Sequence, residues 1–221
     1  MLRVGLTGGV ACGKTTVAGM LRVRGAYVLL ADKLAHELME PGKPVYSRVV
    51  EHFGRGILNP DATISRAKLA ELAFPNRIQE LNAIVHPAVL AAENAWMDET
   101  GRRDPKAITI CEAALLYEAG GEARFDRIIT VICSPERKLE RFASRLGIAP
   151  EQARPDLERR MRAQWPDELK VKRADYVIDN SGTMAETEAR VEQLWRQLLA
   201  DERAQAEPKP QSTQSDTETR E

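Results

Sequence analysis

The first fifteen residues contain the pattern that most constrains what this chain can fold into. Residues 8–15 read Gly-Gly-Val-Ala-Cys-Gly-Lys-Thr, which fits the phosphate-binding loop pattern G-x-x-x-x-G-K-S/T. The mostly apolar residues 2–6 precede this loop and are typical of a buried strand, whereas the residues from Thr15 onward are typical of a helix. Because the motif needs a strand, a glycine-rich turn and a helix in that order, the sequence predicts that this loop binds ATP or GTP.

Each part of the loop has a chemical role in binding phosphate. The glycines let successive backbone N–H groups point at phosphate oxygens, and the helix N-terminus adds unpaired N–H donors and partial positive charge. The Lys14 ammonium can reach the β- and γ-phosphates, and the Thr15 hydroxyl can ligate Mg²⁺. The residues predicted to bind the nucleotide are therefore Gly8, Gly9, Ala11, Cys12, Gly13, Lys14, Thr15 and Thr16.

Cys12 is the one cysteine of three that lies inside the loop. A helix N-terminus and the Lys14 ammonium both lower a thiol pKa, so one hypothesis is that oxidation of Cys12 blocks nucleotide binding. The favoured alternative is a small residue that fills the loop. Cys111 and Cys133 lie in apolar runs, where we expect buried and inert thiols.

Composition narrows the class of protein. The chain has 221 residues, of which 43% are hydrophobic, so it can bury a substantial core in one large or two small domains. The formal net charge of −1 argues against binding of nucleic acid by bulk charge. No run has the length of a membrane span, and the N-terminus does not resemble a signal peptide. We expect a cytoplasmic protein, monomeric or weakly homo-oligomeric, without a nucleic-acid or membrane partner.

Five strand-like runs alternate with helical segments. Such alternation favours a parallel sheet with helices on both faces. The predicted architecture is an α/β P-loop fold with a five-stranded parallel sheet flanked by helices. Its strands are expected near residues 2–6, 26–30, 107–111, 127–133 and 176–178, and its nucleotide-binding core in residues 1–32 and 101–203.

Two long connections are expected to carry function. Residues 33–100 contain several helix-like runs with Pro75 and Pro87 between them, which predicts a helical substrate-binding insertion at the carboxyl ends of the strands. Residues 136–172 are rich in arginine, which favours a mobile lid over the nucleotide phosphates, with a solvated charged face as the alternative. Residues 204–221 turn polar and are expected to form a disordered tail.

Four polar residues outside the loop are candidates for a metal or a second substrate. Asp32 follows the second strand and can accept a proton from an attacking hydroxyl, or else it caps a helix that starts at Lys33. Glu112 ends the third strand, where a carboxylate can hold Mg²⁺ through water. Glu118 is a weaker candidate whose alternative is a surface helix position. A lone histidine such as His86 is more often structural than functional.

The order of further motifs along the chain resembles that of the dephospho-coenzyme A kinases, from Leu6 to about Gly182. The phosphate loop is generic, but the ordered set of the other motifs is specific. The matching residues are Ala31-Asp32, Ala35-His36, Pro41-Gly42, Leu81-Asn82, His86-Pro87, Leu115-Leu116-Tyr117-Glu118, Arg160-x-x-x-Gln164, Lys170, Ala174-Asp175 and Val177-Ile178-Asp179-Asn180. The chain departs from the family pattern at three positions, where Ala11 replaces a glycine, Leu30 an aspartate and Ala114 a proline.

This resemblance implies ATP-dependent phosphorylation of the ribose 3′-hydroxyl of dephospho-coenzyme A, with Mg²⁺ bound by Thr15 and Glu112. It implies that the catalytic residues are Asp32, Lys14, Arg141 and Arg145, and that Asn180 lies near the adenine of ATP. Arg141 and Arg145 share one helix face because they are four residues apart. The implied substrate-binding residues are Asp32, His86, Leu116, Glu118, Arg160 and Gln164.

Two other functions remain open at this point. One is a kinase for another small metabolite, such as a nucleoside monophosphate or a sugar acid. The other is a nucleotide-sensing regulatory protein that binds ATP without transferring phosphate. The chain lacks the Asn-Lys-x-Asp stretch with which a guanine-specific switch protein reads its base.

Overall fold

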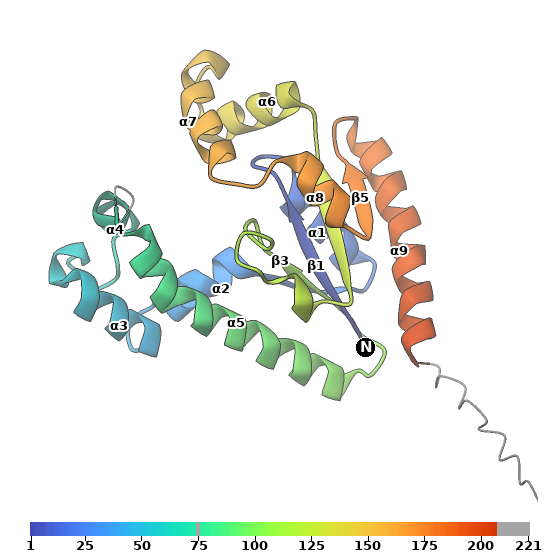
Figure 1. The fold of residues 1–221 in the computed structure, drawn as a ribbon, viewed down its shortest axis with the longest axis horizontal. Helices are drawn as coiled ribbons and strands as arrows, with labels where there is room; N and C mark the ends of the chain where they lie inside the picture. Colours follow the sequence, from blue (N-terminus) through green and yellow to red (C-terminus); the bar gives the residue numbers. More distant parts are fainter. Residues whose placement is uncertain (74–75, 207–221) are drawn as a thin grey trace, which may run out of the picture.

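The sheet has five parallel strands, as the sequence predicts, in the order β2-β3-β1-β4-β5 (Figure 1). The computed structural model describes residues 1–73 and 76–206. The strands are β1 (Leu2–Gly8), β2 (Tyr27–Leu30), β3 (Ile108–Glu112), β4 (Arg127–Ile132) and β5 (Tyr176–Asp179). Their bounds lie within two residues of the predicted ones. The strand order brings the carboxyl ends of β1, β2 and β3 together at one edge of the sheet.

Helices cover both faces of the sheet because the chain reverses its direction across the sheet. The chain runs from β1 outward to β2 and then back through β3 and β4 to β5, so right-handed crossovers place the first connecting helix opposite the later ones. Helix α1 (Lys14–Val23) packs with the closing helix α9 (Met184–Ala206) on one face. Helix α5 (Ile78–Arg103) contacts β3, and helix α8 (Asp167–Arg173) contacts β4.

The main core lies between the sheet and the α1–α9 pair. Its fully buried side chains include Leu6 of β1, Leu21 of α1, Ile129 of β4 and Leu198 of α9. Burying a large apolar side chain in this way stabilises the fold by on the order of 1.5–3 kcal/mol. The core therefore holds β1 rigid directly beneath the phosphate loop.

A second hydrophobic cluster holds together the helices between β2 and β3. Helices α2 (Ala31–Leu38), α3 (Pro44–Phe53) and α4 (Arg66–Ala73) pack against α5. Buried side chains such as Val49, Phe53 and Ile84 fill the space between them. This cluster is separate from the main core, as a helical insertion requires.

The predicted break at Pro87 is wrong, because α5 runs through this residue without interruption from Ile78 to Arg103. A proline inside a helix loses one backbone hydrogen bond and crowds the preceding turn. Helix α5 contacts α2, α3, α4 and β3 along its length, so tertiary packing outweighs that local penalty.

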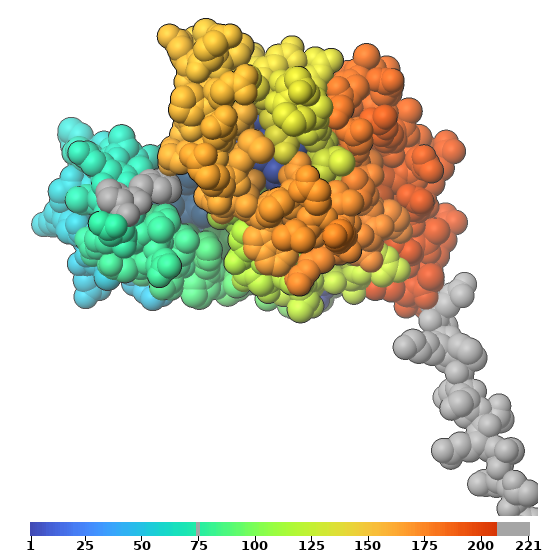
Figure 2. Space-filling model, turned by 45° about the horizontal axis from the view of Figure 1, so that its top comes forward, coloured from blue at the N-terminus to red at the C-terminus, as the bar shows by residue number. Residues whose placement is uncertain are grey.

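The arginine-rich segment after β4 forms a helical hairpin above the sheet. Helix α6 (Pro135–Leu146) begins at Ser134, whose side chain accepts a hydrogen bond from the Arg137 backbone, and it ends at Gly147 with a φ of 68°. Helix α7 (Pro150–Arg162) packs against α6 around the fully buried Phe142. Figure 2 shows the blue N-terminal residues at the bottom of a hollow between this hairpin and α8.

The end of the chain is helical for slightly longer than predicted. Helix α9 continues to Ala206, so residues 204–206 of the predicted tail are helical. Residues 207–221, the rest of that tail, lie outside the described residues. Within the described ranges, no helix has both the length and the apolarity that a membrane span needs.

Candidate active site

At two positions of the phosphate loop, the backbone conformation and the close neighbours leave no room for a side chain. Gly8 and Gly13 have φ angles of 148° and 89°. A Cβ at Gly8 would lie 2.0 Å from the carbonyl oxygen of Val131, and one at Gly13 would lie 2.2 Å from Nδ2 of Asn180. Ala11 also has a positive φ, 58°, at the position where the family pattern has glycine. An alanine in this left-handed conformation costs on the order of 1 kcal/mol.

Lys14 and Thr15 begin α1, and their side chains bond to different parts of the site. The Lys14 ammonium donates to the carbonyl oxygens of Gly8 and Gly9, at 3.2 and 3.1 Å, so it lies folded over the loop. The Thr15 hydroxyl donates to Oε2 of Glu112 at 3.0 Å. The structure therefore brings the two predicted metal-binding residues together.

Glu112 is a perturbed carboxylate. Burial raises its pKa above the ordinary value, and the nearby Asp32 carboxylate raises it further. The Lys14 ammonium and the hydrogen bond from Thr15 oppose that shift. Two acidic side chains that repel each other beside a phosphate loop are typical of a site that accepts a cation.

Asp32 lies next to this pair. It is the second residue of α2, whose N-cap is Leu30, so the alternative in which Asp32 caps a helix starting at Lys33 is wrong. The Asp32 side chain is exposed and lines a cavity of about 190 Å³ with Thr15, Glu112 and His36. Within the described residues, no group of three or more His, Cys, Asp or Glu is arranged to bind a metal by itself.

His36 is a site residue to which the sequence analysis gave no role, although it belongs to the matching Ala35-His36 segment. It lies one helical turn after Asp32 and lines the same small cavity. Burial lowers the pKa of His36, the positive charge of Arg66 lowers it further, and Asp32 opposes the shift. The spacing of four residues after Asp32 on a helix could have identified it.

A second pocket opens on the other side of Asp32. Its volume is about 230 Å³, and three of the predicted substrate-binding residues, Asp32, His86 and Leu116, line it. The pocket lies between α2, α5 and the segment that follows β3. The structure thus brings Asp32 and His86 together across about 50 residues of sequence.

Asn180 and Arg141 support the phosphate loop from behind. Nδ2 of Asn180 donates to the carbonyl oxygen of Cys12 at 2.8 Å, and Nη1 of Arg141 donates to the same oxygen at 3.3 Å. Nη2 of Arg141 also donates to the backbone oxygen of Asn180 at 2.9 Å. The Thr187 hydroxyl of α9 donates to Oδ1 of Asn180 at 2.7 Å. These contacts fix the loop to β5, α6 and α9.

The Cys12 thiol is not activated. It is fully buried and donates to the carbonyl oxygen of Gly9 at 2.9 Å. Burial raises its pKa, which outweighs the lowering by Lys14, so the hypothesis of a depressed pKa is wrong. The favoured small-residue interpretation agrees with this geometry. Burial likewise raises the pKa of Cys111 to about 12 and that of Cys133 to about 11.

Arg145 and Arg160 do not reach the loop in this conformation. Their guanidinium groups lie over the Phe142 ring, at 5.1 and 5.5 Å from its centre. Arg160 also donates to Oδ2 of Asp156 at 2.9 Å. Among the residues that the structure describes, neither arginine forms a hydrogen bond with the phosphate loop.

Glu118 anchors the segment that returns from the hairpin to the sheet. Its Oε1 lies 2.9 Å from Nζ of the fully buried Lys170 and accepts the backbone N–H of Trp165 at 2.7 Å. The side chain is 14% exposed, so the alternative of a surface position is wrong. The adjacent Gln164 has a buried Oε1 without a hydrogen-bond partner in the described part of the chain.

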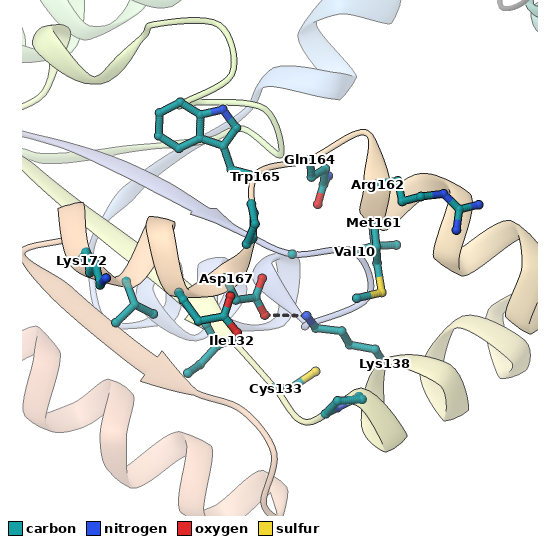
Figure 3. A pocket seen from close by; sticks show the side chains of 15 residues that line it. Val10, Ile132, Cys133, Lys138, Met161, Arg162, Gln164, Trp165, Asp167 and Lys172 are labelled. Atoms are coloured by element: carbon teal, nitrogen blue, oxygen red, sulfur yellow. Dashed lines mark hydrogen bonds and ion pairs between the residues drawn. The ribbon is translucent and has the colours of Figure 1, made fainter.

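A larger cavity of about 880 Å³ lies between α6, α8 and the phosphate loop (Figure 3). Nζ of Lys138, which is 5% exposed, lies 2.5 Å from Oδ2 of Asp167. A Cβ at Gly9 would lie 2.7 Å from Oδ1 of Asp167 and 3.1 Å from Nζ of Lys138. The ion pair therefore packs directly against the loop backbone. Nothing in the arginine-rich sequence distinguishes Lys138 from its charged neighbours.

The fold and the site define a P-loop kinase, with a phosphate loop, two acidic residues at neighbouring strand ends and a separate pocket beside one of them. The chain belongs to the dephospho-CoA kinase family, whose model matches residues 2–186. A dephospho-CoA kinase of Aquifex aeolicus is 43% identical over 203 residues, which is 91% of this chain and 100% of the relative. One of Syntrophus aciditrophicus is 39% identical over 98% of this chain and 92% of the relative. A solved structure from Thermus thermophilus has a TM-score of 0.71 and 32% identity, and the match covers 90% of this chain and 97% of that one.

Proposed function

We propose that this protein transfers the γ-phosphoryl group of ATP to the ribose 3′-hydroxyl of dephospho-coenzyme A, giving coenzyme A and ADP. The observation that carries this proposal is that Asp32 lines both the cavity beside Thr15 and Glu112 and the pocket that contains His86. A phosphate donor on the loop and a hydroxyl acceptor in the pocket would meet at this carboxylate. Family membership supplies the identity of the acceptor.

The transfer needs positioning and charge stabilisation rather than covalent chemistry on the protein. Asp32 accepts the proton of the 3′-hydroxyl as its oxygen attacks the γ-phosphorus. The bond from the γ-phosphorus to the β–γ bridging oxygen breaks, and ADP leaves. Backbone N–H groups of the loop and the Lys14 ammonium stabilise the negative charge on the transferring group.

Mg²⁺ belongs to this proposal because the side chains beside the loop suit it. The Thr15 hydroxyl and the Glu112 carboxylate are hard oxygen donors 3.0 Å apart, and Asp32 lines the same cavity. A bound Mg²⁺ would neutralise charge on the β- and γ-phosphates. In this arrangement Glu112 must be ionised, which requires a pH above its raised pKa.

The remaining site residues divide into direct and indirect roles in this proposal. His86 contributes to the acceptor pocket, whereas Asn180 and Arg141 hold the loop in the conformation that binds phosphate. Glu118 and Gln164 act at the base of the predicted lid, and Arg145 and Arg160 would contact phosphate only after the hairpin moves. The cytoplasmic location and the monomeric or weakly associated state also remain proposals.

An ADP-release assay with Mg·ATP and a panel of acceptors tests the reaction. We expect ADP formation with dephospho-coenzyme A and none with AMP, shikimate or gluconate. Turnover with a different acceptor would show that the protein is a kinase and that dephospho-coenzyme A is not its acceptor. ATP binding without turnover on any acceptor would favour the regulatory alternative.

The role of Asp32 is tested by Asp32→Asn. This variant should lose turnover by about 10²–10⁴-fold, because the amide cannot accept the proton, while ATP still binds. Glu37→Gln is a matched control, since Glu37 is an exposed acidic residue on the same helix. If Asp32→Asn stays within a few-fold of Glu37→Gln in turnover, Asp32 is not the base.

A further inference from the structure

The pocket beside Asp32 also contains a buried ion pair for which the proposed mechanism has no use. Glu93 lies on α5, and Arg124 lies at the end of the short 3₁₀ turn η2 (Glu122–Arg124). Nη1 of Arg124 is 2.7 Å from Oε2 of Glu93, and both residues line the pocket. The Glu93 side chain is 2% exposed and that of Arg124 is 20% exposed.

The hydrogen bonding of Arg124 is incomplete. Its Nη1 also donates to Oδ1 of Asn94 at 3.4 Å, and its guanidinium lies 4.9 Å from the centre of the Phe125 ring. Its Nε is buried and has no acceptor among residues 1–73 and 76–206. A buried ion pair is costly to form, and an unmade hydrogen bond to a charged group adds to that cost. A ligand that offers Nε an acceptor would remove part of this penalty.

The rest of the pocket suits a flat and mostly uncharged group. Val85, Val89 and Leu116 line it, and Asp32 and His86 mark the end near the phosphate loop. From His86 to Glu93 the axis of α5 rises by about 10 Å. The pocket volume of about 230 Å³ exceeds that of a purine ring. A diphosphate would be excluded from the far end, because Glu93 already neutralises Arg124.

We propose that this pocket holds the adenine base of the acceptor and that Glu93 and Arg124 recognise its edge. The 6-amino group of adenine donates to the Glu93 carboxylate, and ring nitrogen N7 accepts from Nε of Arg124. Adenine presents this donor and acceptor side by side. The inference rests on the proposed function, which places the reacting ribose at Asp32.

The base fits this position better than the pantetheine arm. In dephospho-coenzyme A the base is bonded directly to the ribose that carries the reacting hydroxyl, whereas a diphosphate separates the arm from that ribose. A group that enters the pocket immediately beside Asp32 is therefore the base. The arm would leave the ribose on the side of the diphosphate, outside this apolar pocket.

The test compares kcat/KM for dephospho-coenzyme A with that for its hypoxanthine analogue, in which oxygen replaces the 6-amino group. We expect the wild type to prefer adenine by about 100-fold, because the analogue leaves Glu93 facing an oxygen. In Glu93→Gln the preference should fall below about 3-fold, since an amide can donate to that oxygen. The KM for ATP should not change. A merely structural defect would lower both rates together and leave their ratio unchanged.

Two further variants control for instability of Glu93→Gln and for effects of changing any acidic residue on α5. Glu93→Gln combined with Arg124→Met removes both buried charges, so it tests the preference if the single variant is unstable, and it should also lose the preference. Glu99→Gln is the matched control, because Glu99 pairs with Arg102 on the exposed side of the same helix. This control should retain the full preference for adenine.

Three outcomes would contradict the inference in different ways. A preference for adenine that persists in both Glu93 variants would overturn the assignment of the base while leaving the kinase activity intact. If the variants instead change only the ratio of the KM for dephospho-coenzyme A to the inhibition constant of AMP, which lacks the arm, the pocket holds the arm and the proposal is wrong. Failure of the wild type to phosphorylate dephospho-coenzyme A would overturn the proposed function itself, and this inference with it.

Discussion

Replacing Asn180 by alanine should loosen the phosphate loop without removing any group that contacts the reacting atoms in the proposed mechanism. Asn180 is 4% exposed, and its side chain bridges the loop and the closing helix. It donates to the Cys12 carbonyl at 2.8 Å and accepts from the Thr187 hydroxyl at 2.7 Å. The substitution removes both bonds at once, together with the longer one that Oδ1 accepts from Nη2 of Arg141 at 3.4 Å.

The expected loss of stability follows from what each partner retains. The Cys12 carbonyl keeps a longer bond from Arg141 at 3.3 Å, and the Thr187 hydroxyl keeps one to the Thr183 carbonyl at 3.1 Å. Neither partner is therefore left fully unsatisfied, and each lost bond should cost about 1 kcal/mol. With the small cavity that Asn180→Ala leaves, the free energy of unfolding should fall by about 2–3 kcal/mol.

Thermal unfolding and ATP binding together test this reasoning. For a chain of this size, the Tm of Asn180→Ala should fall by about 4–12 °C, and the Kd for ATP should rise because the loop carbonyl is free to turn. Thr187→Val is the control, since it removes the hydroxyl that bonds to Asn180 and to the Thr183 carbonyl but leaves the contact between Asn180 and Cys12, and it should cost about 1–2 kcal/mol with unchanged ATP affinity. A Tm equal to that of the wild type, or equal ATP affinities in the two variants, would refute the argument.

Three further changes probe the loop and its acidic partner. Lys14→Ala should reduce kcat by about 10²–10³-fold or more in the ADP-release assay, because it removes charge stabilisation of the transferring group; near-normal turnover would contradict the loop assignment. Gly8→Ala should fail to bind ATP in calorimetry, since its Cβ would lie 2.0 Å from the Val131 oxygen and its φ is 148°; normal affinity would show that the loop has another conformation. Because the pKa of Glu112 is raised in the free protein and its ionised form is required, the acid limb of kcat/KM for Mg·ATP should lie at a higher pH than an ordinary glutamate would give, and Glu112→Gln should lack this limb; an identical profile in that variant would assign the limb elsewhere.

Much of the fold and part of the site could be predicted because they depend on local patterns. The phosphate loop needs only adjacent residues, and the ends of β2 and β3 place Asp32 and Glu112 at the same edge of the sheet. Their approach to Thr15 follows from the parallel arrangement of the strands. The strand bounds were predictable to within two residues because they too depend on local patterns of apolar residues.

The supporting contacts could not be predicted because they join residues far apart in the chain. Asn180 and Cys12 are 168 residues apart, and Lys138 and Asp167 are 29 apart. No periodicity or motif links such residues, and each is one polar residue among many in its segment. Pro87 shows the opposite failure, in which a valid local rule is outweighed by the packing of α5 on four other elements.

The contacts of α6 determine which part of the predicted lid can move. Lys138 and Arg141 are three residues apart, so they share one face of α6; Arg141 donates to the Cys12 carbonyl, and the ion pair of Lys138 with Asp167 packs against the loop at Gly9. The first half of α6 is therefore fixed to the loop, and the mobile part of the lid should begin beyond Arg141. Arg145 lies in that mobile part, so closure of the hairpin could bring it to a bound phosphate. Amide hydrogen exchange should accordingly be slower in residues 137–141 than in α7 without nucleotide, and ATP should slow the exchange of α7 most. Equal exchange in both segments would show that the whole hairpin moves as one unit and that the contacts with Gly9 and Cys12 break when it does.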